Sequence, residues 1–211
     1  LGGLHSCSDI CANDVIVDVE DMPRTIEFNA DHSVVTVSAN WHFHEFLRAV
    51  GEKGKSVSAT GGTDRQTLAG IISTNTAPAT PRCTIYELVN WIEYIAVDEK
   101  TGAVVEKRVN STDPDFRAVV GSLGAIGIIT KVQTRLIDQL FFETVQKVTK
   151  LEEMLGDIRK TSEIYDFWRI DWIPDTDLGV IWTAKKLPAA DPNGDYPPDQ
   201  SQNVLEAVCR V

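Results

Sequence analysis

Three short segments rich in glycine, serine and threonine, far apart in the chain, constrain what this protein can be more than any other feature. The first is Gly2-Gly3-Leu4-His5-Ser6, the second runs from Thr60-Gly61-Gly62-Thr63 into Gln66–Thr74, and the third is Gly121–Thr130. Because glycine carries no Cβ, its backbone N–H can approach a pyrophosphate closely, and adjacent hydroxyls add donors. Any one segment alone is most simply a turn. The prediction of a phosphate site therefore depends on the three acting together.

Composition and charge narrow the classes of partner. The chain has 211 residues, of which 43% are hydrophobic, enough for one substantial core or two small ones. Its formal net charge of −11 argues against a nucleic-acid partner and against docking on an anionic membrane. An anionic ligand can still bind where backbone amides recognise it. No apolar run approaches the ~20 residues that span a bilayer, so we expect no transmembrane segment.

The cysteines and histidines give no pattern typical of a metal site. Cys7 and Cys11 lack a second Cys/His pair that would complete one, and Cys83 and Cys209 lie far from them in sequence. We expect reduced thiols in an intracellular protein and no bound metal. His42 and His44 could share a face of a strand and bind metal, but surface histidines at the start of a helix are the favoured interpretation.

Hydrophobic spacing and turn residues predict alternating strands and short helices. Strands are expected at 15–19, 33–39, 91–97, 104–109, 126–137, 141–148, 165–173 and 178–184. Helices are expected at 44–50, 85–89, 113–120 and 149–160. Thr112 would cap the third helix, and Thr149 with Glu152 would form a capping box on the fourth. A domain boundary is expected near Leu136–Phe141.

In order and spacing, the three segments together resemble the flavin domain of the vanillyl-alcohol oxidase superfamily, most closely its aldonolactone oxidases. The motifs that carry the resemblance are Gly2–Asp9, Gln66–Thr74 and Gly124–Thr130, and Phe167–Pro174 is similar to the start of the family's substrate-domain sheet. The resemblance implies an α+β fold. A PCMH-type FAD-binding domain of mixed sheets with helices would span residues 1–137, and the start of an antiparallel-sheet substrate domain would span 138–211.

The resemblance also implies a cofactor and the residues that hold it. FAD would be bound, and His5 matches the histidine that many members link covalently to the flavin 8α-methyl group; a hydrogen-bonded loop histidine is the open alternative. Matching positions imply cofactor contacts at Gly2, Gly3, Leu4, His5, Ser6, Ser8, Asp9, Gly61, Thr63, Gln66, Thr67, Gly70, Ser73, Thr74, Gly127, Ile128 and Ile129. The family's first βαβ unit would precede residue 1 and its catalytic base would follow residue 211. The chain therefore reads as a fragment, and we assign no catalytic residue.

The activity that the resemblance implies is oxidation of a sugar lactone or polyol by hydride transfer to flavin, with O₂ or another electron acceptor. A second hypothesis remains beside it. Where the family reads Gly-Ser/Thr-His-Gly, this chain has Asn75-Thr76-Ala77-Pro78, and proline lacks a backbone donor. That departure favours a flavin-free, non-catalytic relative or fragment acting as a binding or interaction protein. Trp168, Trp172 and Trp182 could form a stacking platform for sugars, although packing within a sheet is the favoured interpretation.

Overall fold

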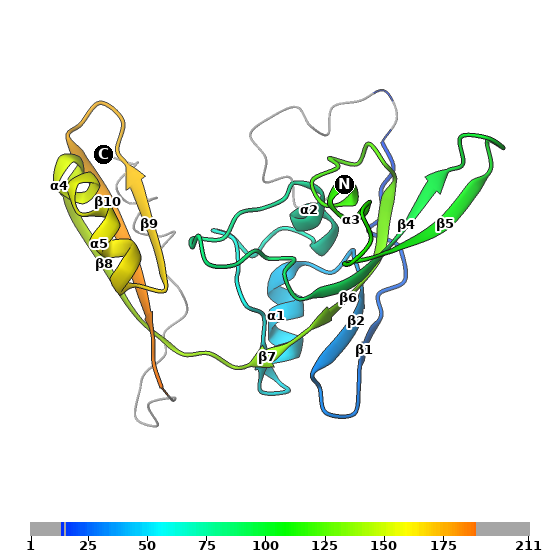
Figure 1. Cartoon of the computed structure of the whole chain (residues 1–211), viewed down its shortest axis with the longest axis horizontal. Coiled ribbons are helices and arrows are strands. Elements are labelled where there is room, and N and C mark those ends of the chain that lie inside the picture. Colours follow the sequence, from blue (N-terminus) through cyan, green and yellow to red (C-terminus); the bar gives the residue numbers. More distant parts are fainter. Residues whose placement is uncertain (1–13, 15, 189–211) are drawn as a thin grey trace. The chain divides into compact units, whose positions relative to one another are not determined.

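The computed structural model describes Asp14 and residues 16–188, and within them the chain forms two compact units that divide after Gln139 (Figure 1). The first unit holds a five-stranded sheet with three helices, and the second holds a three-stranded sheet with two helices. Every strand pair in the described part of the chain is antiparallel. The α+β fold class predicted from the sequence is confirmed.

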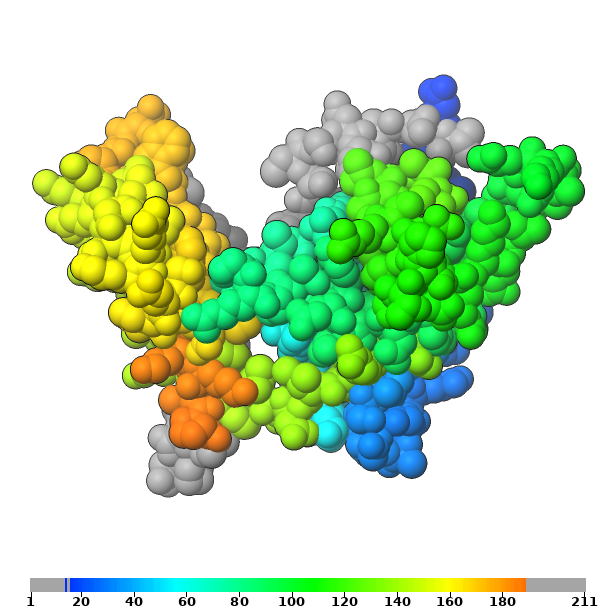
Figure 2. Space-filling view, viewed as in Figure 1, coloured from blue at the N-terminus to red at the C-terminus, as the bar shows by residue number. Residues whose placement is uncertain are grey.

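The sheet of the first unit has the order β1-β2-β6-β4-β5. Its strands are β1 (Ile26–Phe28), β2 (Val34–Ser38), β6 (Ile128–Arg135), β4 (Val89–Val97) and β5 (Val104–Asn110). The last two form a long hairpin whose tip projects from the first unit (Figure 2). Strand β6 is therefore central, and it links the hairpin to the β1–β2 pair.

A row of buried side chains crosses one face of this sheet. Val37, Val132, Ile92 and Val109 are successive partners on four neighbouring strands, and each is at most 4% exposed. Each such side chain stabilises the fold by about 1.5–3 kcal/mol through burial. The alternate positions are polar, as on Gln133, whose amide donates to the Thr36 hydroxyl at 3.1 Å. This alternation is typical of an antiparallel sheet with one face covered.

Three helices cover the apolar face. Helix α1 (Phe43–Gly51) buries Phe43, Phe46 and Val50, and α2 (Leu68–Ser73) buries Leu68, Ile71 and Ile72. Helix α3 (Phe116–Val119) is a single turn that buries Phe116 and Val119. Two short strands, β3 (Lys55–Ser56) and β7 (Ile137–Asp138), pair with each other, and β3 contacts α1. Lys55 Nζ donates to Asp138 Oδ1 across this pair at 2.7 Å.

The second unit is built on the sheet β8-β10-β9. Strand β8 (Phe142–Lys150) leads into α4 (Leu151–Gly156) and α5 (Ile158–Ile164), and the hairpin β9 (Phe167–Trp172) with β10 (Leu178–Lys186) returns alongside β8. The turn between β9 and β10 is closed by Thr176, whose hydroxyl donates to the Ile173 carbonyl at 2.8 Å. The proline and aspartates of this turn were a sequence signal for it.

Several predicted elements differ from the structure. In the described part of the chain, residues 16–19 are not a strand, and Ile16 and Val17 are 51% and 56% exposed. Residues 85–88 form a turn rather than a helix, and the chain enters β4 at Val89. The third helix starts at Phe116 after Asp115, and Thr112 does not cap it.

The last predicted helix is divided in two at Asp157. Its capping box is also absent: Lys150 occupies the N-cap without a side-chain bond, while the Thr149 hydroxyl donates to Glu153 at 2.6 Å. The short strand β1 was not predicted, because three residues are too few to show alternation.

Within residues 14 and 16–188, no helix has both the length and the apolar character that crossing a bilayer requires.

Candidate flavin site

Helix α2 is fixed at its start by groups of the protein itself. The amides of Leu68 and Ala69 donate to the carbonyls of Trp41 and Ala39 at 3.0 and 2.9 Å. Thr67, which is 7% exposed, is the N-cap, and its hydroxyl accepts from the Gly70 amide at 3.2 Å. Thr67 and Gly70, both predicted to contact the cofactor, therefore form the N-terminal capping hydrogen bond of α2. Because these amides are already bonded within the protein, the start of α2 has few amides left to donate to a ligand.

The other end of α2 meets the third glycine segment. The Gly121 amide donates to the Ile72 carbonyl and the Leu123 amide donates to the Ser73 carbonyl, each at 2.9 Å. Gly121, Leu123 and Gly124 have φ values of +78°, +53° and +82°, a left-handed path that glycine adopts readily. The segment therefore caps the helix, and it brings two of the three predicted segments side by side.

Two backbone amides in this loop remain available to a ligand. The amides of Gly124 and Ile126 donate to no acceptor in the described part of the chain, and both residues are exposed. A Cβ built on Gly124 would meet nothing within 4 Å, so the backbone there faces open space. Successive amides on a backbone with positive φ form concavities that bind anions. Sequence reasoning quoted Gly121 and Gly124 in the motif without assigning them contacts.

The second glycine turn packs against the loop that follows α2. A Cβ on Gly61 would lie 2.7 Å from Thr76 Cγ2 and 3.7 Å from Gln66 Oε1. Gln66 Nε2 donates to the Thr76 hydroxyl at 3.4 Å, and that hydroxyl lies 3.1 Å from the hydroxyl of Thr74. Thr74 in turn donates to the Gly70 carbonyl at 2.8 Å. Gly61, Gln66 and Thr74 are therefore brought together, and Thr76 joins them although no prediction named it.

The buried oxygen Gln66 Oε1 has no hydrogen-bond partner within residues 14 and 16–188. Leaving a buried acceptor unpaired costs about 1–3 kcal/mol, so a ligand that donates a hydrogen bond to this oxygen would be favoured. Thr63, by contrast, has a local role, since its hydroxyl accepts from the Arg65 amide at 3.4 Å. Ser73 is half-buried beside Leu123.

Gly127, Ile128 and Ile129 have a structural explanation within the sheet. A Cβ on Gly127 would lie 2.2 Å from the Ile95 carbonyl oxygen, so only glycine fits against β4 at this point. Ile128 and Ile129 pair with Ile95 and Tyr94, and Ile129 is 3% exposed in the core. The Thr130 hydroxyl that follows is buried and has no partner among the described residues.

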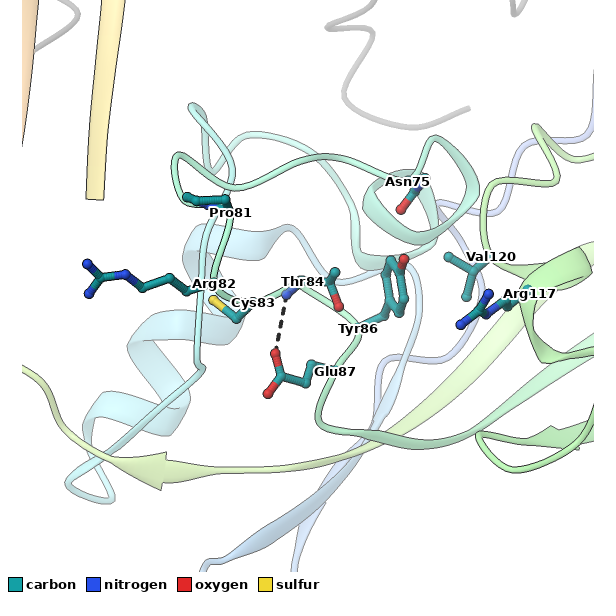
Figure 3. Close-up of a pocket in the computed structure, with 9 residues that line it drawn as sticks. All are labelled: Asn75, Pro81, Arg82, Cys83, Thr84, Tyr86, Glu87, Arg117 and Val120. Atoms are coloured by element: carbon teal, nitrogen blue, oxygen red, sulfur yellow. Dashed lines mark hydrogen bonds between the residues drawn. The ribbon is translucent and has the colours of Figure 1, made fainter. Parts of the chain in front are cut away.

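A pocket of about 620 Å³ opens in the first unit next to the loop after α2 (Figure 3). In Figure 3 the Tyr86 hydroxyl points toward Asn75, Arg117 extends from α3 toward Tyr86, and Arg82 points away from them. The volume of the pocket lies in the range of small-molecule sites. The pocket is lined by Asn75, Pro81, Arg82, Cys83, Thr84, Tyr86, Glu87, Arg117 and Val120. Of these, the sequence had drawn attention only to Asn75 and to the thiol of Cys83, because no motif marks the others.

Two arginines and one carboxylate set the charge of this pocket. Glu87 accepts from the Thr84 amide at 3.3 Å, which holds the carboxylate at the wall. Arg117 has no partner in the described part of the chain. Burial, with Glu87 nearby, raises the pKa of the Cys83 thiol, so this cysteine is a neutral lining group rather than a thiolate.

The first glycine segment lies outside the described residues. Gly2, Gly3, Leu4, His5, Ser6, Ser8 and Asp9 all belong to it, as do Cys7 and Cys11. His42 and His44 lie at the start of α1, with ring centroids 5.7 Å apart and Nδ1 atoms against the carbonyls of Arg65 and Asp64. No set of three metal-ligating side chains occurs among residues 14 and 16–188.

The described groups fit the pyrophosphate of a nucleotide. In the described part of the chain, the amides of Gly124 and Ile126 are free, and their loop is hydrogen-bonded to the C-terminal end of α2. The carbonyls of Ile72 and Ser73 at that end already accept hydrogen bonds from the loop, so they add little negative charge near a bound phosphate. Recognition by neutral amides also suits a chain with a net charge of −11.

The sequence pattern of the FAD binding domain family matches residues 1–106, just over half of the chain. The chain belongs to the FAD binding domain family. The resemblance drawn from the glycine segments is thereby confirmed, and FAD is the cofactor.

Individual relatives agree with this assignment. The chain is 30% identical over 193 residues to "D-arabinono-1,4-lactone oxidase" of Kluyveromyces lactis, covering 88% of this chain and 36% of the relative. A Candida glabrata protein of the same name is 29% identical over 192 residues, again covering 88% of this chain and 36% of the relative. The chain thus spans about a third of the length of these relatives.

A solved structure shows the same fold. The structure titled "Solvent-stable cholesterol oxidase" superposes with a TM-score of 0.71 at 15% identity, covering 92% of this chain and 42% of that one. The second hypothesis, a flavin-free binding protein, is not favoured by these matches.

Proposed function

We propose that this chain is the flavin-binding part and the beginning of the substrate domain of an FAD-dependent oxidase that acts on a sugar lactone or polyol. Family membership and the name that the K. lactis and C. glabrata relatives share support the proposal. Residues 1–137 would form the FAD-binding domain, and 138–211 would form the first part of the substrate domain.

The observation that carries the proposal is the loop at Gly121–Gly127. Two of its amides cap α2, and the exposed residues Gly124 and Ile126 have amides with no acceptor in the described part of the chain. A pyrophosphate oxygen is the acceptor that such amides recognise without a lysine.

The cofactor would be held by groups from both described segments. Gly124 and Ile126 would donate to phosphate oxygens, and the hydroxyls of Ser73 and Thr74 would lie beside them. Gln66 would use its unpaired Oε1 to accept from a ribityl hydroxyl. The pocket beside Asn75 offers a phenol, a hydroxyl and a guanidinium, which suit the oxygen-rich parts of the same nucleotide.

Seven further predicted contacts belong to the first segment. Gly2, Gly3, Leu4, His5, Ser6, Ser8 and Asp9 would wrap the pyrophosphate, and His5 would bond covalently to the flavin. When bound, FAD supplies the chemistry, which is acceptance of a hydride from a substrate C–H bond and return of the electrons to O₂ or another acceptor. The chain's own part is to position the cofactor and exclude water from it.

The proposal is tested with the protein purified under native conditions. Bound flavin should absorb near ~450 nm, and D-arabinono-1,4-lactone added without O₂ should bleach that band. Glucose, a sugar that is not a lactone, serves as the control and should leave the band unchanged within the same time. A protein that neither carries flavin nor takes up added FAD would contradict the proposal.

A further inference from the structure

Three side chains are aligned across the sheet of the second unit. Trp182 on β10 pairs with Gln146 on β8 and with Arg169 on β9. Residues paired directly in antiparallel strands carry their side chains on the same face, with Cβ atoms about 4.5–5.5 Å apart. Gln146, Trp182 and Arg169 therefore form one row with the tryptophan at its centre.

The row lies on the face opposite to the helices. A Cβ on Gly179 would point at the Met154 side chain of α4, 3.0 Å away, so the face that carries Gly179 is the one that α4 covers. Because side chains alternate along a strand, Trp182, three residues further along β10, points to the other face. Figure 1 shows α4 and α5 on one side of the β8-β10-β9 sheet.

Two donors of the row are buried and unpaired. Among the residues that the structure describes, Gln146 Nε2 and Arg169 Nη2 have no hydrogen-bond partner. Arg169 donates instead through Nε to Asp171 Oδ2 at 2.9 Å, on the same face two residues away. Asp171 neutralises the guanidinium, so the row is nearly neutral while it still presents N–H groups on both sides of an indole ring.

The row Gln146–Trp182–Arg169 is chemically complementary to one kind of ligand. An indole face packs well against the C–H groups of a sugar ring, and flanking N–H donors need acceptor oxygens. A fully charged ligand gains little from a guanidinium that is already paired with a carboxylate. The complement is a neutral ring that carries hydroxyl or carbonyl oxygens at its edge.

We propose that the row Gln146–Trp182–Arg169 binds the ring of the sugar-lactone substrate, with Trp182 stacking on the ring and the two N–H groups donating to its oxygens. This assignment rests on the proposed function. It makes the three residues determinants of substrate specificity, with Asp171 as a positioning residue that orients Arg169.

Trp182→Leu tests the stacking, and Trp172→Leu is the matched control. Trp172 lies on the same sheet but on the helix-covered face, and it is 58% exposed. In the flavin-loaded protein, Trp182→Leu should raise KM for D-arabinono-1,4-lactone about tenfold with kcat little changed, whereas Trp172→Leu should alter neither. Equal KM values in the two variants, both shown by thermal unfolding to be folded, would overturn the assignment.

Arg169→Gln tests the donor, with Arg159→Gln on the exposed side of α5 as the control. Equilibrium dialysis with the labelled lactone should show binding about five- to tenfold weaker for Arg169→Gln only. The open-chain aldonate, an anion, should bind the wild type less tightly than the neutral lactone does.

Failure of this assignment can be told from failure of the proposed function. Dialysis measures lactone binding whether or not flavin is reduced. Wild-type protein that binds the lactone through this row without oxidising it would refute the oxidase activity alone. Oxidation that is unaffected by Trp182→Leu and Arg169→Gln would refute the row alone.

Discussion

Gly61 packs against Thr76 with no room for a side chain, since a Cβ on Gly61 would lie 2.7 Å from Thr76 Cγ2. The glycine turn thereby holds Thr76 where its hydroxyl accepts from Gln66 Nε2 and lies 3.1 Å from the hydroxyl of Thr74. The close contact explains how a turn that precedes α2 bears on the loop that follows the helix.

Gly61→Ala should therefore disturb this loop. Rotation of Thr76 would relieve the contact but would break its hydrogen bonds, so we expect the free energy of unfolding to fall by about 1–3 kcal/mol. Chemical denaturation measures it. Gly51→Ala is the control, because a Cβ there meets nothing within 4 Å, and its effect should stay within about 0.5 kcal/mol. Similar stabilities of the two variants would contradict the packing at Gly61.

Gly127→Ala should be more damaging than Gly124→Ala. At Gly127 the new methyl would meet the Ile95 carbonyl oxygen at 2.2 Å, so we expect a loss of at least about 3 kcal/mol. At Gly124 the space is open, and the cost is the strain of an L-residue at φ +82°, about 1–2 kcal/mol. Thermal unfolding of both variants measures which of them loses more stability. The reverse order would show that Gly127 is not a packing residue of β4.

His5→Ala should release the flavin from covalent attachment. The variant should still bind FAD through the amides at Gly124 and Ile126, but acid precipitation should then leave the flavin in the supernatant. The wild type should retain its flavin in the pellet. Flavin that stays with the denatured variant would show that another residue forms the bond.

The ion pair between Lys55 and Asp138 should make stability depend on pH. The hydrogen bond and charge of Lys55 hold the pKa of Asp138 below its ordinary value of 3.8. A carboxylate with a lowered folded-state pKa stabilises the fold above its ordinary pKa, and this contribution is lost as the pH falls through the lowered value. Asp138→Asn should thus be slightly less stable than the wild type at pH 7, and the difference should vanish once the pH is below the lowered pKa of Asp138. A difference that persists there would exclude this ion pair as its cause.

Much of the fold could be predicted where hydrophobic alternation was long. The hairpin of β4 and β5 and the hairpin of β9 and β10 follow from alternating runs on either side of clear turn residues. Residues 16–19 show the limit, because β-branched residues favour a strand only when a neighbour pairs with it. The break between α4 and α5 at Asp157 leaves no sequence signal as clear as a proline.

The site was predictable in part for a similar reason. Glycines identified the segments that meet at the end of α2, but not which amides the helix would use. The Leu123 amide donates to the Ser73 carbonyl from a backbone with φ +53°. A leucine in the sequence does not predict a positive φ. Tyr86 and Arg117 reach the pocket through folding of separate segments, and their own neighbours in sequence carry no motif.

Amide hydrogen exchange across residues 121–127, with and without FAD, tests the central claim most directly. The Gly121 and Leu123 amides, bonded to Ile72 and Ser73, should be protected in both states. The Gly124 and Ile126 amides should exchange quickly without FAD and slow at least about tenfold when it is bound. Fast exchange at both positions in protein shown by its absorbance to be saturated with FAD would contradict a pyrophosphate bound by this loop.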